Sequence, residues 1–442
     1  PLISAIYADA QTRLREPRHL EQMIKTLDQI DWFSAQKDGL GDLYEGLLEK
    51  NANETKSGAG QYFTPRALIN TMVRCLKPQP GERIQDPSAG TAGFLIAAHE
   101  YIKSQTDELY ALNDKDKTFQ TTQAYTGIEL VPGTRRLALM NCLLHGMEGG
   151  SEGVVQLGNA LGQTGASLEK ADVILANPPF GTSKGGDASI TRDDLTYKTS
   201  NKQLAFLQHI YRNLKPGGRA AVVLPDNVLF EAGVGTDVRR DLMNKCNLHT
   251  ILRLPTGIFY AQGVKTNVLF FTKGSEADKY QEENCTENVW VYDLRTNMPS
   301  FGKRTPFGDK HLTPFEQVFS PSPLAGEGRG EGAAGNSHPI NRTEGEYSFH
   351  SKDIELPEHS DENQGIDPRL AHSRWRSFSR QWIAEHKGDS LDISWLKDSD
   401  SVDAANLPEP NVLAREAKDE LDGALIELNT LLMALDDGHP NE

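Results

Sequence analysis

The order of apolar and polar positions divides the chain into two helical ends and a middle of alternating strands and helices. Between residues 58 and 275, short apolar runs bounded by Gly, Pro and polar residues alternate with stretches of helical periodicity. This alternation predicts a mostly parallel sheet with helices on both faces. The expected strands are ERIQD, AYTGIEL, GVVQL, ADVILA, RAAVVLP, HTILRLP and TNVLFFTK. The prediction is an α/β fold around a seven-stranded sheet.

The two ends show helical periodicity. Near the N-terminus, one helical face carries Leu20, Met23, Ile24, Leu27 and Ile30. Near the C-terminus, alternating 3/4 spacing from 414 to 435 forms a heptad seam, which fits a partner helix and packing on the protein's own body equally well. We expect four regions, namely 1–57 (the C-terminal part of a helical domain), 58–275 (the α/β domain), 276–345 (an extension with a low-complexity insertion at 320–339) and 346–442 (an acidic region ending in the heptad helix).

Net charge limits the possible partners. The chain of 442 residues carries −16, and residues 346–442 hold 9 Lys or Arg against 22 Asp or Glu. The nearly neutral remainder can hold a basic cleft but cannot attract phosphates strongly over a wide surface. If nucleic acid is the substrate, a partner is expected to bring much of the affinity.

Other features of composition favour a cytoplasmic protein. No apolar run is long enough to span a bilayer, and no secretory signal is present. The four cysteines have no C-x-x-C spacing, so we expect buried thiols and no metal site. The chain starts at Pro1, which is consistent with a trimmed fragment.

The stretch RIQDPSAGTAGFLIAA has the form strand, glycine turn, helix. Gly90 and Gly93 let the backbone approach a ligand closely, and the following helix presents free N–H groups. Asp86 lies at the carboxyl end of the strand, where open α/β sheets bind ligands. The stretch is neither a P-loop nor a G-x-G-x-x-G fingerprint, and its acid suits a ligand with cationic and hydroxyl groups. A purely structural turn explains it about as well.

Three further positions are candidates for ligand contacts. Glu129 ends the next strand and can accept hydrogen bonds from ribose hydroxyls, although a solvated strand-end acid is the alternative. Asn159 follows the third strand and can bond an adenine edge, although a turn asparagine is the alternative. Thr64 followed by Pro65 predicts the N-cap and first turn of a helix that runs to about Lys77.

The fourth strand ends in ANPPFG. The two prolines, Pro178 and Pro179, fix the loop and remove two N–H donors. What remains is an acceptor surface, made by the Asn177 side-chain oxygen and the Pro178 carbonyl, with the aromatic ring of Phe180 beside it. Such a surface fits a planar amino group on an sp² carbon. A rigid loop with a packed phenylalanine is the alternative.

Six motifs in order resemble one family. They are GAGQYFTPR, DPSAGTAGF, GIEL, NPPFG, LKPGGRAAVVLPDNVLF and LPTGIFYAQGVKTNVLFF. Together they resemble the modification (M) subunit of type I restriction–modification systems, N6-adenine DNA methyltransferases with the gamma order of motifs. The similarity runs from about Asp42 to Asp293 and resumes in SRWRSFSRQWI and DSLDISWLKD.

The resemblance implies roles for particular residues. The positions that match the S-adenosylmethionine site are Gln61, Tyr62, Phe63, Thr64, Pro65, Arg66, Asp86, Gly90, Thr91, Ala92, Gly93, Glu129 and Asn159. Asn159 departs from the pattern, because related enzymes often carry an acid there. The catalytic tetrapeptide is matched by Asn177, Pro178, Pro179 and Phe180, and the stacking of a flipped base by Phe180 and Phe259.

The resemblance also implies a function. It implies a Rossmann-like S-adenosylmethionine-dependent methyltransferase fold, with residues 58–275 as the catalytic domain, and methyl transfer to adenine N6 in double-stranded DNA. It further implies a separate specificity (S) subunit, a second copy of this chain in a complex of two M subunits with one S subunit, and a restriction (R) subunit. The helical ends are the candidates for these contacts. The alternatives are a methyltransferase acting on RNA guanine or protein glutamine, and a scaffold that binds the donor without catalysis.

Overall fold

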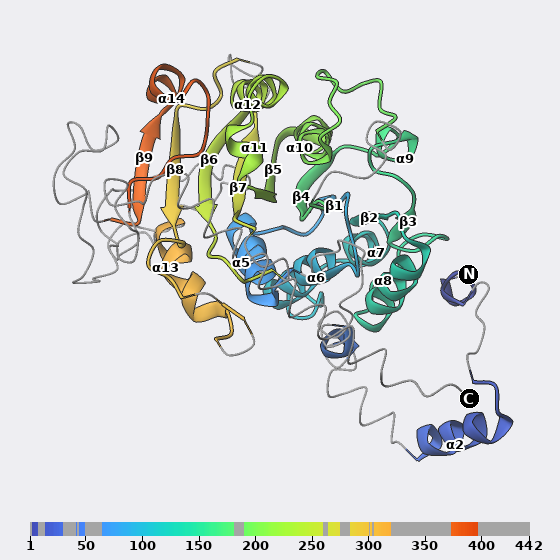
Figure 1. Ribbon diagram of the computed structural model, residues 1–442. Helices are drawn as coiled ribbons and strands as arrows, with labels where there is room; N and C mark the ends of the chain where they lie inside the picture. Colours follow the sequence, from blue (N-terminus) through green and yellow to red (C-terminus); the bar gives the residue numbers. More distant parts are fainter. Residues whose placement is uncertain are drawn as a thin grey trace, which may run out of the picture. The chain divides into compact units, whose positions relative to one another are not determined.

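The computed structural model describes the α/β body of the chain and parts of the N-terminal region (Figure 1). The described residues are 2–7, 14–29, 41, 44–48, 64–180, 190–259, 264–274, 283–299, 301–302, 305–319 and 373–396. The low-complexity stretch 320–339 and the heptad seam 414–435 lie outside these residues.

One mixed sheet organises the body. Its strands are β1 (Ile84–Asp86), β2 (Tyr125–Glu129), β3 (Val155–Leu157), β4 (Ala171–Ala176), β5 (Leu214–Pro225), β6 (Cys246–Arg253), β7 (Thr266–Lys273), β8 (Asn288–Asp293) and β9 (Trp375–Ser379). They lie in the order β3-β2-β1-β4-β5-β7-β6-β8-β9. β7 runs antiparallel to β5 and β6, β9 runs antiparallel to β8, and the other neighbours are parallel. The α/β class and the mostly parallel sheet are confirmed.

The count of seven strands is wrong for the described sheet, which has nine. All seven expected strands are present, and β8 and β9 extend the sheet beyond β6. β9 comes from the acidic C-terminal region, and its Trp375 stacks on Trp290 of β8 at a centroid distance of 5.0 Å. The sheet therefore continues past residue 275, and the division of the chain into four regions stays a prediction.

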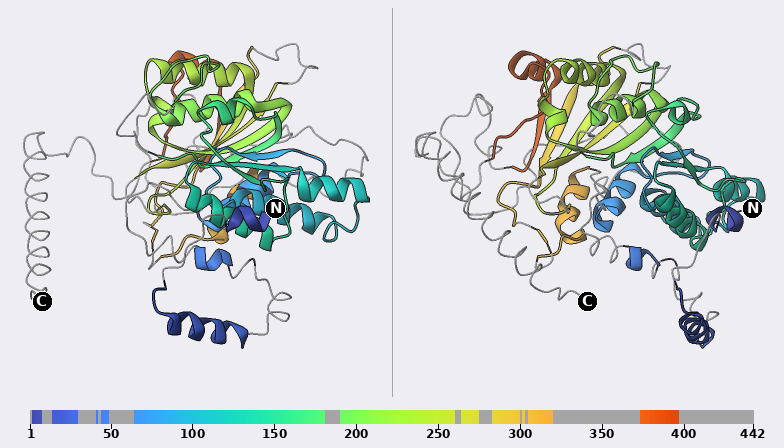
Figure 2. Two further views of the ribbon diagram at one scale, coloured as in Figure 1. Left: turned by 90° about the vertical axis from the view of Figure 1, so that its right-hand side faces the viewer. Right: turned by 45° about the vertical axis from the view of Figure 1, so that its right-hand side comes forward.

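Helices cover both faces of the sheet, as the two apolar faces of buried parallel strands require. In chain order they are α1 (Leu2–Ile6), α2 (Pro17–Asp28), α5 (Arg66–Leu76), α6 (Gly93–Gln105), α7 (Asp114–Thr122), α8 (Pro132–Leu144), α9 (Gln163–Ala166), α10 (Lys202–Asn213), α11 (Asn227–Phe230), α12 (Val234–Lys245), α13 (Asp309–Phe319) and α14 (Arg380–Lys387). Figure 2 shows two layers, with α10, α12 and α14 on one face and α5, α6, α8 and α13 on the other.

The extension after residue 275 is fastened to the body through α13. Arg74 on α5 forms ion pairs with Glu316 and Asp309 of α13. Phe315 packs with Phe270 of β7 at a ring-centroid distance of 5.8 Å. Because α5 and α13 share one face of the sheet, this packing helps to hold α5 in place.

Two local expectations meet different outcomes. Helix α5 begins at Arg66 with Pro65 at the N-cap, so the predicted N-cap role of Thr64 is wrong. The predicted helix around Leu20–Leu27 is confirmed as α2, and the structure buries no residue of that helix. None of the helices in the described ranges has the length and apolar character that a bilayer crossing requires.

Candidate functional site

The candidate site lies where the strand order reverses. β1 is flanked by β2 on one side and β4 on the other, and all three strands are parallel. Their carboxyl ends therefore meet at one edge, the place where open α/β sheets bind ligands. Asp86 is the last residue of β1, Glu129 is the last of β2, and Asn177 follows β4 directly. The structure thus brings together residues from three of the predicted motifs.

The turn after β1 has an unusual backbone. Gly90 has φ +54° and Ala92 has φ +70°, both in the left-handed region. A Cβ on Gly90 would meet no atom within 4 Å, so glycine is needed there for its conformation and not for space. Ala92 occupies the N-cap position of α6, which begins at Gly93. A left-handed alanine is strained, and such residues gather at ligand-binding sites.

The side chains of Asp86 and Glu129 both accept hydrogen bonds from residues of this turn. Asp86 accepts hydrogen bonds from the Ser88 N–H at 2.9 Å and the Ser88 hydroxyl at 3.3 Å. Glu129 accepts from the Gly90 N–H at 3.0 Å and from the Val131 N–H at 2.8 Å. Glu129 therefore links the end of β2 to the glycine turn after β1. This contact was not predicted from the sequence.

Burial makes both carboxyl groups hard to ionise. Desolvation, with a smaller contribution from the neighbouring Glu129 charge, raises the pKa of Asp86 to about 7, against the hydrogen bonds from Ser88. Desolvation also raises the pKa of Glu129, against its backbone hydrogen bonds. Two buried acids with raised pKa values in one place fit a cationic ligand, because a nearby positive charge favours the ionised carboxylate.

Asn159 is engaged in its own turn. Its Oδ1 accepts a hydrogen bond from the Leu161 N–H at 2.9 Å. The chain returning after the proline loop lies on the same turn, because the Thr191 N–H donates to the Leu161 carbonyl at 2.9 Å. Arg192 is held there by Asp194 and donates to the Ala160 carbonyl at 3.3 Å. This geometry favours the turn-asparagine alternative for Asn159.

The side chain of Asn177 is held at one end only. Its Nδ2 donates a hydrogen bond to the Thr64 hydroxyl oxygen at 2.9 Å. Its Oδ1 is buried and has no hydrogen-bond partner within the described part of the chain. A buried acceptor without a partner costs on the order of 1–3 kcal/mol of stability. Each buried group of this kind calls for an explanation, and a hydrogen-bond donor on a bound ligand is one.

The proline loop is anchored to helix α10. Gln203, a buried residue in the first turn of α10, donates from Nε2 to the Pro179 carbonyl at 3.0 Å. The N-cap Asn201 accepts from the Gln203 N–H at 2.9 Å and donates to Glu231 at 2.6 Å. Polar side chains around the start of α10 thus fix the position of the tetrapeptide.

The two predicted stacking residues contact each other. The rings of Phe180 and Phe259 pack edge to face, with centroids 5.9 Å apart and an interplanar angle of 79°. Phe180 is half-buried and Phe259 is buried. The preceding turn is fixed by Gly257, where a Cβ would lie 2.1 Å from the Phe301 carbonyl oxygen. The aromatic pair of Phe180 and Phe259 therefore lies at the proline loop.

The structure gives contacts for some of the other residues that were predicted to bind the methyl donor. Arg66 forms an ion pair with Glu45 of the N-terminal region. The Thr91 carbonyl accepts from Asn141 Nδ2 at 3.0 Å. Gln61, Tyr62 and Phe63 lie outside the described residues.

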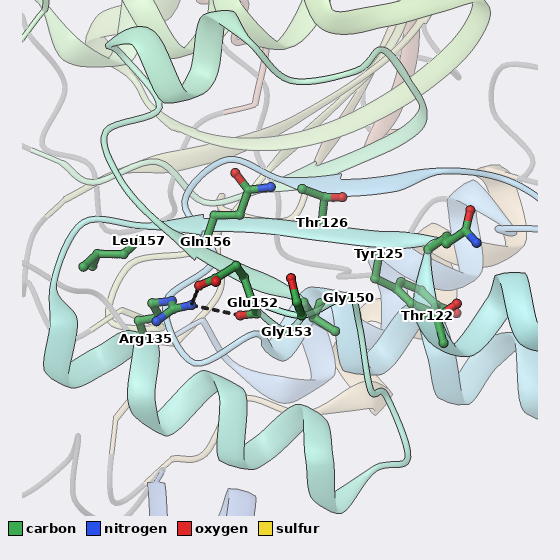
Figure 3. Close-up of a pocket in the computed structure, with 12 residues that line it drawn as sticks. Thr122, Tyr125, Thr126, Arg135, Gly150, Glu152, Gly153, Gln156 and Leu157 are labelled. Carbon is green, nitrogen blue, oxygen red and sulfur yellow. Dashed lines mark hydrogen bonds and ion pairs between the residues drawn. The ribbon is translucent and has the colours of Figure 1, made fainter. Parts of the chain in front are cut away.

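A polar pocket of about 530 Å³ lies elsewhere, along the start of β2, the hairpin before β3 and helix α8 (Figure 3). Arg135 points into it and donates to the Val155 carbonyl at 2.7 Å and the Glu152 carbonyl at 2.9 Å. None of the predicted site residues lines this pocket. It is distinct from the candidate site.

Comparison with known proteins agrees with the geometry. The family described as N-6 DNA Methylase matches residues 35–362. This chain belongs to the N-6 DNA methylase family.

Individual relatives show which branch of the family this chain resembles. The chain is 58% identical to the methylase subunit of the type I restriction enzyme EcoKI of Escherichia coli K12, over 98% of this chain and 80% of the relative. It is 57% identical to the corresponding StySPI subunit of Salmonella potsdam, over 99% of this chain and 80% of the relative. The crystal structure of the EcoKI M protein superposes with a TM-score of 0.71, covering 87% of this chain and 74% of the other. The chain is thus a homologue of type I methylase subunits, and the resemblance inferred from the motifs is confirmed.

Two contacts of this N-6 DNA methylase were missed from sequence. Thr64 was expected to cap a helix and to hold the donor, and its contact with Asn177 was not predicted. Gln203 was not singled out at all. The signal for Gln203 was a polar residue on the buried face of an otherwise apolar helix, in NKQLAFLQHIYRNL. Buried polar side chains need partners, so such a position indicates a specific contact.

Proposed function

We propose that this chain transfers a methyl group from S-adenosylmethionine to the N6 atom of adenine in DNA, as the modification subunit of a type I restriction–modification system. The observation that carries the proposal is the buried Asn177 oxygen, which has no hydrogen-bond partner among the described residues and stands at the start of a proline loop in an N-6 DNA methylase. That atom is an acceptor positioned for an amino group, and adenine N6 is the amino group that the family name states.

The donor site fits S-adenosylmethionine. Asp86 and Glu129 are buried carboxyl groups with raised pKa values, which suits a ligand that carries positive charge and hydroxyl groups. The left-handed turn at Gly90 and Ala92 leads into α6, whose first N–H groups can meet a carboxylate. We assign donor binding to this turn, to Glu129 and to the segment 61–66.

The base side fits a flipped adenine. The Asn177 oxygen and the Pro178 carbonyl can accept the two hydrogens of the amino group, since proline offers no competing N–H. Accepting both hydrogens draws the nitrogen lone pair out of conjugation with the ring, which makes the nitrogen a better nucleophile. S-adenosylmethionine, when bound, supplies the electrophilic methyl group on a sulfonium centre. Asn177 acts by positioning and electrostatics, with no covalent intermediate.

The aromatic pair of Phe180 and Phe259 completes the proposed base site. Unstacking the target base from DNA costs a few kcal/mol. Stacking on Phe180 or Phe259 can return about 1–3 kcal/mol. The two rings pack edge to face and so present two differently oriented aromatic surfaces beside the proline loop.

We infer the partners from the similarity to type I methylase subunits. We propose that a separate S subunit reads the DNA sequence, that two copies of this chain flank it and that an R subunit joins the full complex in the cytoplasm. The charge supports a partner-dependent reader, because a chain with net charge −16 cannot attract DNA by charge alone.

Mass spectrometry of N6-methyladenine tests the proposal. DNA is taken from methylation-deficient cells that express this chain alone or together with a gene for a specificity subunit. Methylation that needs the partner is the expected result, whereas methylation by the chain alone would contradict the assigned role of the S subunit. If protein that binds the donor methylates no DNA in either case, RNA or protein becomes the better substrate class.

A further inference from the structure

The contact between Thr64 and Asn177 joins two motifs that lie 113 residues apart. Thr64 stands immediately before α5, and its hydroxyl oxygen accepts the Asn177 Nδ2–H at 2.9 Å. The hydroxyl does not cap α5, because the N-cap is Pro65 and no side chain caps that helix end. The motif assigned to the donor thus directly contacts the side chain assigned to the base.

The orientation of the Asn177 amide decides what it can bind. One end of an asparagine amide is an acceptor and the other carries two donors. A rotation of 180° about the last side-chain bond exchanges them at little steric cost. With the oxygen toward the target, the amide accepts from an amino group. With the nitrogen toward the target, two N–H groups face two N–H groups, and the site repels its substrate.

In the structure the Thr64 hydroxyl pairs with the nitrogen end of the amide. Its oxygen accepts from Nδ2, and Oδ1 is left as a buried acceptor without a partner in the described part of the chain. Thr64 lies just before α5, whose Leu68 and Met72 are buried in the core and whose Arg74 is ion-paired to α13.

We propose that Thr64 is a positioning residue that keeps the Asn177 oxygen directed toward the substrate amino group. This inference rests on the proposed function of Asn177 as acceptor. It gives Thr64 a role in the methyl-transfer step in addition to any contact with the donor. The hydroxyl acts through Asn177 and need not touch the base.

The first test compares two substitutions at this position. Thr64→Val keeps the shape and removes the hydroxyl, whereas Thr64→Ser keeps the hydroxyl. At saturating donor and DNA, Thr64→Val should lower kcat about tenfold or more, and Thr64→Ser should stay within about threefold of wild type. The measurement uses the full-length chain with its specificity partner, together with the dissociation constant for S-adenosylmethionine. Loss of donor binding with unchanged kcat in Thr64→Val would overturn the proposal.

Thr71 provides a matched control on the same helix. Its buried hydroxyl donates to Glu316, on the side of α5 that faces α13. Thr71→Val therefore removes a buried hydroxyl from α5 without altering the contact to Asn177. We expect kcat within about twofold of wild type in this variant. If Thr71→Val lowered kcat as much as Thr64→Val, the effect would report general weakening of α5 and would contradict the proposal.

A double-substitution cycle isolates the orientation effect. Both oxygens of a carboxylate accept, so in an Asn177→Asp background the orientation no longer matters. The effect of Thr64→Val should then shrink from about tenfold to less than about threefold. An equal loss in both backgrounds would overturn the proposal. If the aspartate background has no activity, the comparison of Val and Ser at position 64 decides alone.

The same assays separate the two levels of the hypothesis. Wild-type protein that forms N6-methyladenine, together with full activity of Thr64→Val, contradicts the positioning role and leaves the proposed function intact. Wild-type protein that forms no N6-methyladenine with its partner present contradicts the proposed function first.

Discussion

The proposed donor side and the proposed base side of the site lie at one sheet edge yet use opposite chemistry. On the donor side, Asp86 and Glu129 are buried acids whose oxygens accept backbone N–H groups. On the base side, the polar group is the neutral amide of Asn177, and its oxygen has no partner in the described part of the chain. The proposed donor side thus holds carboxyl groups that a cationic ligand would help to ionise, whereas the proposed base side offers a neutral acceptor.

This difference predicts which binding step should depend on pH. The pKa of Asp86 is raised to about 7, so this group changes its ionisation near neutral pH. The amide of Asn177 does not titrate at all. Donor binding should therefore depend on pH through Asp86, whereas the orientation of the base should not. The substitutions below contrast the two sides.

The largest effect is expected for Asn177→Ala. Removing a preorganised group that acts on the reacting atom typically lowers kcat by about 10²- to 10³-fold. Donor binding should change little, because the substitution leaves Asp86 and Glu129 in place. Methylation kinetics and donor titration measure the two properties separately. Donor affinity that fell as steeply as kcat would show that the two sides are not independent.

Asp86→Asn should weaken donor binding by about 10- to 100-fold at pH 8, because a hydrogen bond from a cationic group to a carboxylate is lost. In the wild type, the protonated acid predominates below about pH 7 and the carboxylate above it. Affinity for a cationic donor should therefore rise as pH increases through about 7, and Asp86→Asn should abolish that rise. Calorimetry from pH 6 to 8 measures it, and a pH-dependent variant would exclude Asp86 as the titrating group.

The same pKa has a consequence for stability, with the opposite sign. Between the ordinary pKa of 3.8 and about 7, the unfolded chain releases the proton and the folded chain keeps it. The contribution of Asp86 to the free energy of unfolding therefore falls as pH rises through this window. Thermal unfolding of Asp86→Asn without ligand should show less of this decline than the wild type does. An identical decline would assign it to other groups.

Phe180→Ala should lower methyl transfer about tenfold, because stacking contributes about 1–3 kcal/mol per base. Donor binding should be affected less than transfer. Rates at saturating donor test this expectation, with Phe259→Ala as the companion variant on the other side of the aromatic pair. An unchanged methylation rate in Phe180→Ala would exclude the stacking role.

The smallest effect is expected for Gln203→Met, which removes the hydrogen bond to the Pro179 carbonyl. A loss of about two- to tenfold in kcat corresponds to one net hydrogen bond. Gln208 is the matched control, since it is also buried on α10 and its amide pairs with the backbone of Tyr197. Gln208→Met should lower the melting temperature similarly but retain activity. Equal losses of kcat in both variants would mean that the anchor acts through the stability of α10.

Much of the fold could be predicted because its signals are local. All seven expected strands occur where their apolar runs and flanking turns predict them. β8 was missed because NVWVYD is a short run in a stretch whose alternation had weakened. β9 was missed because it comes from residues 375–379, after the low-complexity segment, and becomes a strand through its pairing with β8.

The sequence by itself determined the strand-turn-helix order, the polar residues at the strand ends and the proline loop after β4. Each of these follows from the spacing of neighbouring residues and from the fixed backbone geometry of Gly and Pro. Only the tertiary structure decided that Thr64 bonds Asn177, that Gln203 holds Pro179 and that Glu129 braces Gly90. These hydrogen bonds join segments far apart in the chain, so they depend on how helices pack on the sheet, and local periodicity carries no record of that packing.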